Sequence, residues 1–431
     1  MRKTFVLTVF AMMFGLLFGC SSGNNVTSES TPSNSNSNNN EEKTTLKIFQ
    51  FKTEIVEQLK QLEQEYESEH PTIDLEIESI TGTDYETKLK AKFAAGDMPD
   101  IFMNEGYADL DNWLEHVEDL SNEPWVEDII DVAREPMERD GKTYGMPVTL
   151  EGIGFGYNKD LFESAGIKEV PTTISELEEA AQKLQDSGIN AFINNYNSYF
   201  PLAMHAFNNP IAKHEDPTAF IKGLNEGTAK LATDELTKQW TDLIQLTIKY
   251  GNKDGIITDH NTARTMFINE EYAIMQTGNW NDPVIVEMNP DMNVGFMPMP
   301  INDDSTLNDT IFVGVPNNWA IYKDSPNKDK AKDFLNWLVT SETGKRYITE
   351  EFRFIPALKS IEASSELGPI SKEIVRYIEE DKVLGWQWAK YPEGVLQLIG
   401  DSIQKFIAGK IDADQMLEEF DKAWQQSISK N

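Results

Sequence analysis

Two short segments of the chain place tryptophan rings beside amide and carboxylate side chains. Residues 278–282 read Gly-Asn-Trp-Asn-Asp after a predicted strand, and residues 386–388 read Trp-Gln-Trp. In an extended backbone, residues two apart project to the same side, so both indoles of the second segment would form one platform; on a helix they would diverge by about 200°. Gly385 before this segment and Tyr391-Pro392 after it favour an irregular backbone. Such segments suit a ligand with an apolar face and a polar rim.

No motif for nucleotide, metal or nucleophilic chemistry is evident in the sequence. Gly141-Lys142-Thr143 lacks the earlier glycine of a phosphate-binding loop, and Tyr157 stands where a dinucleotide fingerprint needs a glycine. The five histidines form no pair at metal-ligand spacing. Residues 19–23 match a nucleophile-elbow pattern, but no strand precedes them and no helix follows. We therefore expect no cofactor, no metal and no catalytic residue.

Strand and helix patterns alternate around these segments. Residues 46–49 and 73–77 read as strands on either side of an amphipathic helix. A second helix, with capping-box spacing from Thr83 to Glu86, precedes the apolar run 101–103. The same spacing from Thr173 to Glu176 predicts another helix start, and Asp160 is a candidate N-cap. This alternation predicts an α/β fold with a mainly parallel, doubly wound sheet, whose ligand crevice lies at the carboxyl ends of the strands.

Several polar side chains follow the predicted strands and would lie where such a crevice opens. Glu105 follows the strand that ends at Met103, and Lys52 follows the first strand. Asp84 and Tyr85 stand at a helix start after a strand, and Glu151 follows the segment from Tyr144 to Leu150.

The length and charge of the chain narrow the classes of partner. A chain of 431 residues predicts two to three domains. Its formal net charge of −34 repels phosphate backbones, so we expect no nucleic-acid partner. The single cysteine excludes an intramolecular disulfide bond.

The first 43 residues indicate export and anchoring. Residues 1–19 combine Arg2-Lys3 with an apolar run that is too short to span a bilayer as a helix, and they read as a signal peptide. The sequence around Cys20 resembles a bacterial lipobox, in which the cysteine receives diacylglycerol after cleavage. Residues 20–43 are rich in Ser and Asn and predict a flexible tether. We expect a lipid-anchored protein on the extracellular face of the cell membrane.

Several motifs occur in an order and at spacings that carry a resemblance. They are Tyr85-Glu86-Thr87-Lys88-Leu89, residues 94–101, Tyr144-Gly145-Met146-Pro147, residues 156–162, Tyr272-Ala273-Ile274-Met275 with Gly278-Asn279-Trp280, and Met297-Pro298-Met299-Pro300. Together they resemble extracellular solute-binding protein family 1, the receptors of carbohydrate ABC importers. Within that family the chain looks nearest to receptors for multiple sugars and raffinose-type oligosaccharides.

The resemblance implies a periplasmic-binding-protein-like fold of type II, with two doubly wound lobes joined by a hinge. Lobe one is expected at residues 44–150 and 310–350, and lobe two at residues 151–309 and 351–431. Hinge closure would trap an oligosaccharide between the lobes, and the protein, expected to be a monomer, would deliver it to the permease subunits.

The resemblance also implies which residues bind ligand. A pyranose has apolar C–H faces that stack on aromatic rings and hydroxyls that need polar partners. The expected ligand-binding residues are Trp280, Asn279, Asp282, Trp386, Trp388, Glu105, Tyr85, Asp84, Glu151 and Lys52. The tryptophans expected in the core are Trp113, Trp125, Trp240, Trp337 and Trp424.

Two alternatives stay open at this stage. An exported glycoside hydrolase needs only two carboxylates roughly 5 to 10 Å apart, a pair that 72 acidic residues can hide. A binding protein for another solute, such as a peptide, a polyamine or a metal chelate, is the second alternative, and a cationic solute would fit the net charge.

Overall fold

The computed structural model describes residues 43–429, without the side chains of residues 82–83 and 131–132. These residues form one compact unit. The predicted signal peptide, Cys20 and nearly all of the tether lie outside the described residues. Within residues 43–429, no helix is long and apolar enough to span a bilayer.

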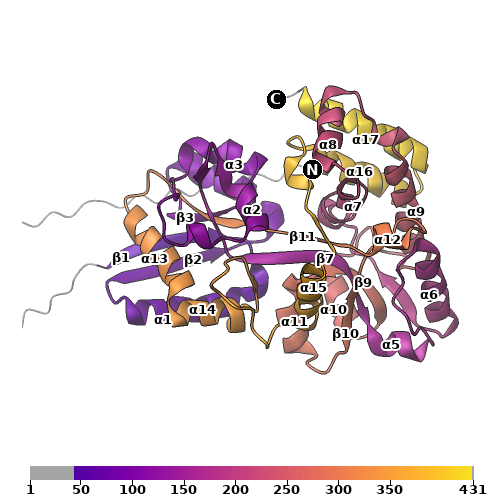
Figure 1. Cartoon of the computed structure of the whole chain (residues 1–431), viewed down its shortest axis with the longest axis horizontal. Coiled ribbons are helices and arrows are strands. Elements are labelled where there is room, and N and C mark those ends of the chain that lie inside the picture. Colours follow the sequence, from indigo (N-terminus) through magenta and orange to yellow (C-terminus); the bar gives the residue numbers. More distant parts are fainter. Residues whose placement is uncertain (1–42, 430–431) are drawn as a thin grey trace, which may run out of the picture. The chain divides into compact units, whose positions relative to one another are not determined.

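The first sheet has the strand order β2-β1-β3-β12-β6. β1 runs parallel to β2 and β3, while β12 runs antiparallel to β3 and β6. Figure 1 shows this sheet beside α1 and α2. Its strands are β1 (Thr44–Gln50), β2 (Ile73–Ser79), β3 (Ile101–Asn104), β6 (Met146–Pro147) and β12 (Asn318–Ile321). We call the residues packed around this sheet the first lobe.

The second sheet is organised around β7 (Thr149–Asn158), all of whose residues are buried. Its order is β14-β11-β7-β9-β8, and β10 and β13 also pair with β7. β7 runs antiparallel to its partners, so this sheet mixes orientations instead of being mainly parallel as predicted. The other strands are β8 (Asn190–Ile193), β9 (Tyr272–Gly278), β10 (Val294–Met297), β11 (Ile311–Gly314), β13 (Ile355–Pro356) and β14 (Val383–Gly385). The residues around it form the second lobe.

Helices and one hairpin complete the described residues. The hairpin joins β4 (Glu138–Arg139) and β5 (Lys142–Thr143). The helices are α1 (Val56–Glu69), α2 (Gly82–Ala95), α3 (Ala108–Trp113), α4 (Asp131–Arg134), α5 (Lys159–Ser164), α6 (Ile174–Asp186), α7 (Asn208–Ala212), α8 (Pro217–Glu226), α9 (Glu235–Lys249), α10 (His260–Ile268), α11 (Asp282–Met288), α12 (Ser305–Asn308), α13 (Lys328–Thr340), α14 (Glu342–Arg346), α15 (Pro369–Glu379), α16 (Val395–Ile407) and α17 (Ala413–Ile428).

The chain crosses between the two sheets several times. It passes from β6 directly into β7, and it returns to the first sheet between β11 and β12. The predicted division assigned residues 310–350 to lobe one, whereas β11 pairs with β7 and β14 in the second sheet. Leu358, assigned to lobe two, forms a bridge with Ile129 of the first lobe. An apolar strand pattern does not reveal which sheet the strand joins, because that depends on distant partners.

The structure confirms one of the predicted helix caps and contradicts two others. The capping box at Thr173 and Glu176 is present and starts α6. The helix expected to begin with a cap at Asp160 is instead capped by Asn158, whose side chain accepts two backbone N–H groups. α2 begins at Gly82 after Thr81, which makes no side-chain cap bond. The tryptophans predicted to be in the core are all buried: Trp113, Trp125, Trp240, Trp337 and Trp424.

The segment after β9 holds two elements of the second lobe in place. Asn279 accepts a hydrogen bond from the Gly152 N–H at 3.0 Å and donates one to the Leu150 carbonyl at 3.1 Å, so it fixes the start of β7. Asp282 is fully buried and accepts the backbone N–H groups of Ile370 and Ser371 at 3.0 and 2.7 Å. It therefore caps α15 from a distant part of the chain.

We expect Asp282→Ala to lower the free energy of unfolding by about 1–3 kcal/mol, because two buried N–H groups would lose their acceptor. Asp282→Asn keeps one acceptor oxygen, so its free energy of unfolding should lie between those of Asp282→Ala and the parent protein. Urea denaturation monitored by circular dichroism measures both effects. An unchanged midpoint for Asp282→Ala would show that α15 does not depend on this cap.

Candidate functional site

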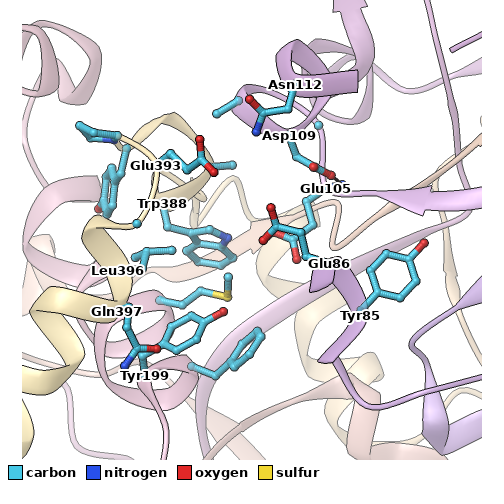
Figure 2. A pocket seen from close by; sticks show the side chains of 18 of the residues that line it. Tyr85, Glu86, Glu105, Asp109, Asn112, Tyr199, Trp388, Glu393, Leu396 and Gln397 are labelled. Carbon is cyan, nitrogen blue, oxygen red and sulfur yellow. Dashed lines mark hydrogen bonds between the residues drawn. The ribbon is translucent and has the colours of Figure 1, made fainter. Parts of the chain in front are cut away.

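Residues of both lobes line a cavity of about 320 Å³, which we call the main cavity. The first lobe contributes Phe51 after β1, Glu86 on α2, Glu105 after β3, and Asp109 and Asn112 on α3. The second lobe contributes Tyr199, Phe200, Trp388, Glu393 and Gln397. Figure 2 shows Trp388 on one side of the cavity and the carboxylates of Glu86 and Glu105 on the other. Aromatic rings and hydrogen-bonding groups therefore face the same space.

The two tryptophans of residues 386–388 stack on each other. Their ring centroids lie 4.4 Å apart at an interplanar angle of 28°. The backbone is irregular at Trp386, as predicted, and Trp388 begins a 3₁₀ turn. The rings meet face to face, so they do not form the flat side-by-side platform that the spacing suggested. Trp388 lines the main cavity, whereas Trp386 stacks on it and lines only the adjoining, smaller cavity.

Gly314 on β11 gives Trp386 its position. A Cβ atom at this residue would lie 2.5 Å from the Trp386 ring, so only a glycine leaves room for the indole. The indole N–H of Trp386 donates to the Phe312 carbonyl at 3.2 Å. Trp386 is thus held between the strand and the Trp388 ring.

Trp280 reaches the cavity only indirectly. It is not among the residues that line the cavity, and its ring covers Gly278 at the end of β9. His205 lies between the two tryptophans, with ring centroids 5.3 Å from Trp280 and 5.9 Å from Trp388. Burial, together with nearby His260, lowers the pKa of His205 to about 3, so its imidazole is neutral. The His205 ring therefore contacts both Trp388 at the cavity wall and Trp280 behind it, and the three rings form one row.

Two acidic side chains deep in the first-lobe wall have raised pKa values. Burial, followed by the charges of Asp109 and Glu86, raises the pKa of Glu105 to about 8. Burial also raises the pKa of Asp109 to about 6, although Asp109 accepts the Glu105 backbone N–H at 2.9 Å. With a pKa of about 8, the half-buried Glu105 carboxyl is mostly protonated at neutral pH.

Lys52 and Glu151 form a buried ion pair with each other, away from the main cavity. The Lys52 ammonium also lies 3.4 Å from Glu54. Burial alone would lower the pKa of Lys52, but the carboxylates of Glu151 and Glu54 outweigh it and raise this pKa. The pair joins the end of β1 in the first lobe to β7 in the second.

The side chains of Tyr85 and Asp84 differ in their surroundings. The Tyr85 hydroxyl accepts the Met103 N–H at 2.8 Å and lies 2.9 Å from the Met103 carbonyl, so it ties α2 to β3. Tyr85 contributes to the cavity lining, but Figure 2 shows its ring directed away from Trp388. Asp84 is exposed, accepts from the Thr81 hydroxyl at 3.3 Å, and does not line the cavity.

Sequence reasoning thus placed Glu105, Trp388 and Tyr85 at the main cavity and missed several of their neighbours. Tyr199, Asn112 and Gln397 gave no local signal, because their approach depends on contacts between distant elements. The Pro392-Glu393-Gly394 sequence has the composition of a turn, and its closeness to residues 386–388 was a usable signal for Glu393.

A smaller cavity adjoins the main cavity, and ion pairs near the two cavities join the lobes. The smaller cavity has a volume of about 110 Å³ and shares Glu105 and Trp388 with the main cavity. The Lys390 ammonium of the second lobe lies 3.4 Å from the Glu135 carboxylate and 5.3 Å from the Tyr107 ring centre, both in the first lobe. Lys90 of the first lobe lies 3.7 Å from Glu393 of the second. Across residues 43–429, no group of His, Cys, Asp or Glu has the arrangement of a metal site.

A family profile described as bacterial extracellular solute-binding protein matches residues 50–345. The melibiose/raffinose/stachyose-binding protein MelE of Bacillus subtilis (strain 168) is 24% identical over 358 residues, which cover 80% of this chain and 79% of MelE. The multiple sugar-binding protein of Streptococcus mutans is 22% identical over 349 residues, covering 77% of this chain and 80% of that protein.

Solved structures share the fold. The protein RafE in complex with raffinose has a TM-score of 0.77 at 18% identity, covering 89% of this chain and 100% of RafE. A sugar transporter protein of Bacillus licheniformis in complex with stachyose has a TM-score of 0.73 at 24% identity, with coverage of 89% and 100%. Because the family profile spans well over half of the sequence, the chain belongs to the bacterial extracellular solute-binding proteins, and it has the two-lobed type II fold that the resemblance implied.

Proposed function

We propose that this protein is the substrate-binding receptor of a carbohydrate ABC importer, anchored to the membrane through a lipid on Cys20. It captures an oligosaccharide in the main cavity by closure of the two lobes and delivers it to the permease. The observation that carries this proposal is the cavity between the lobes, where the face of Trp388 meets hydrogen-bonding side chains of both lobes. The sugars named for MelE and for the RafE complex support an oligosaccharide.

Each part of the cavity wall has a role in this proposal. Trp388 stacks on the apolar face of a sugar ring, and Trp386 keeps the stacking ring in place. Glu105 and Asn112 from the first lobe and Gln397 from the second bond sugar hydroxyls. Asn279, Asp282, Lys52 and Glu151 already bond protein groups, so in this proposal they support the site without touching the sugar.

The segment from Trp386 to Gly394 couples binding to closure. It carries Trp388, and its Lys390 and Glu393 also form ion pairs with Glu135 and Lys90 of the first lobe. A sugar stacked on Trp388 would add contacts between this segment and the first lobe, and so would favour the closed arrangement. The permease would then distinguish the loaded receptor from the empty one.

We expect a thermal-shift screen of mono-, di- and oligosaccharides to find a stabilising ligand. A ligand at 100 times its dissociation constant stabilises a protein by about 2.7 kcal/mol. Polyamines and short peptides serve as controls, and chromatography checks that the sugar is recovered intact. Stabilisation by a control alone would contradict a sugar receptor, and cleavage of the sugar would indicate a hydrolase.

Trp388→Ala should weaken sugar affinity by about thirtyfold, which corresponds to about 2 kcal/mol, because the stacking surface is lost. Isothermal titration calorimetry measures the change. The matched control is Trp337→Ala, since Trp337 is 8% exposed against 6% for Trp388 but lies on α13, away from the cavity. Equal affinity losses in the two variants would mean that the effect comes from lost stability alone.

Gly314→Ala should weaken sugar affinity by about tenfold, because the new methyl group displaces Trp386 and with it the Trp388 ring. Gly385→Ala is the control, since its Cβ would meet only the Gln387 amide at 3.5 Å. Titration of both variants with the same sugar tests the support that Trp386 gives. If Gly314→Ala binds as tightly as Gly385→Ala, the stacked pair does not set the affinity.

Cys20→Ser should move the protein from the membrane fraction to the medium or periplasm, because the only thiol that can carry the lipid is removed. Cell fractionation with immunoblotting, together with labelling by a radioactive fatty acid, measures this change. Ser22→Ala is the control for the same segment. A variant that keeps its signal peptide would also stay on the membrane, so the mass of Cys20→Ser is compared with the mass of the mature parent protein. A variant that has lost the signal peptide but still stays on the membrane would contradict the lipid anchor.

A further inference from the structure

The charges around the main cavity are of one sign. Its described lining residues include four carboxylates, Glu86, Glu105, Asp109 and Glu393, and no Lys, Arg or His. Lys90 compensates the charges of the two more exposed carboxylates, because its ammonium lies 2.6 Å from Glu86 and 3.7 Å from Glu393. The side chains of these three residues are all more than half exposed. The deeper pair, Glu105 and Asp109, has no cation within ion-pair distance among the described residues.

Glu105 also lacks a hydrogen-bond donor for its carboxyl group. Asp109 accepts the backbone N–H of Glu105, but no described residue donates to the Glu105 side chain. In the adjoining cavity the nearest cation is Lys390, and its ammonium is directed to Glu135 and the Tyr107 ring. Glu105 lines both cavities, so its carboxyl group lies where they adjoin. Because Glu105 is half-buried, solvent satisfies this carboxyl group in the empty cleft, and a ligand that displaces the solvent has to replace that partner.

The opposite wall suits a cation as well as a sugar ring. Trp388 and Tyr199 lie across the cavity from Glu105 (Figure 2), and Phe200 also lines the cavity. Aromatic faces attract ammonium groups, and an ammonium-carboxylate hydrogen bond is stronger than one from a neutral hydroxyl. A neutral sugar would leave the Asp109 carboxylate without a compensating charge and would not favour ionisation of Glu105, and a sugar with a carboxylate or a phosphate would be repelled.

We propose that the cleft selects an oligosaccharide that carries a protonated amino group, with Glu105 as the residue that binds this ammonium. The inference rests on the proposed sugar-binding function and names its substrate class: amino sugars with free amines. The titratable groups that face Glu105 are Glu86 on α2, Asp109 on α3, the neutral Tyr199 phenol of the second lobe, and the Lys390-Glu135 pair of the adjoining cavity. Ammonium binding ionises Glu105, and its proton passes to the buffer.

The test compares oligosaccharides that differ only in charge. Glucosamine and galactosamine oligomers of two to four units, in α- and β-linked series, are titrated beside their N-acetylated and hydroxyl counterparts at about pH 6.5, where the amines are protonated. We expect the best amine to bind at least tenfold more tightly than its neutral counterparts. Titration in buffers of different ionisation enthalpy should show proton release with the amine, because burial raises the pKa of free Glu105 to about 8.

Glu105→Gln removes the charge but keeps the size of the side chain. It should lower amine affinity at least tenfold, narrow the preference for amines to less than threefold, and abolish proton release. Glu115→Gln is the control for net charge, since Glu115 is exposed and lines none of the cavities described above. It should retain the full preference.

The outcomes separate this inference from the proposed function. If neutral sugars such as raffinose or stachyose bind while amines bind no better than their counterparts, the amine preference is overturned and the sugar receptor stands. The same conclusion follows if Glu105→Gln keeps the preference. If no sugar of either kind binds at millimolar concentration, both proposals fail.

Discussion

The buried ion pair between Lys52 and Glu151 is the contact on which the cleft depends. Two charges removed from water are tolerated only when they compensate each other, so neither side chain can leave the other without a large penalty. The pair fixes the end of β1 relative to β7, the strand that organises the second sheet. It thereby sets where the walls that carry Glu105 and Trp388 begin.

Close packing around β7 explains why glycines recur at every second residue of this strand, which no sequence motif explained. The glycines at 152, 154 and 156 fail as a dinucleotide fingerprint, yet each has a neighbour that excludes a side chain. A Cβ at Gly152 would lie 2.7 Å from Ile374 of α15, and one at Gly156 would lie 2.7 Å from Thr277 of β9. The spacing therefore reflects a strand buried on both faces, where small residues let a helix and other strands approach.

Local sequence predicted those parts of the molecule that local physics determines. The α/β class, the capping box at Thr173 and the irregular backbone at Trp386 depend on neighbouring residues, and Glu105 follows from the rule that crevices open at strand ends. The partner of Asp282 could not be predicted, because it is the start of a helix far along the chain. Tyr199 and Gln397 reach the cavity through the same kind of distant packing, for which one sequence carries no signal.

The stacked indoles have a further consequence for how this protein can be studied. Two indoles in face contact at 4.4 Å couple their electronic transitions, so Trp386 and Trp388 give the cleft a chiral optical signal of its own. Near-ultraviolet circular dichroism therefore carries a contribution from the geometry of this wall, beside those of the seven other tryptophans, and a difference spectrum with and without ligand isolates its change. A ligand that tilts or separates the rings changes the sign or size of that band, and the spectrum becomes a record of occupancy in solution.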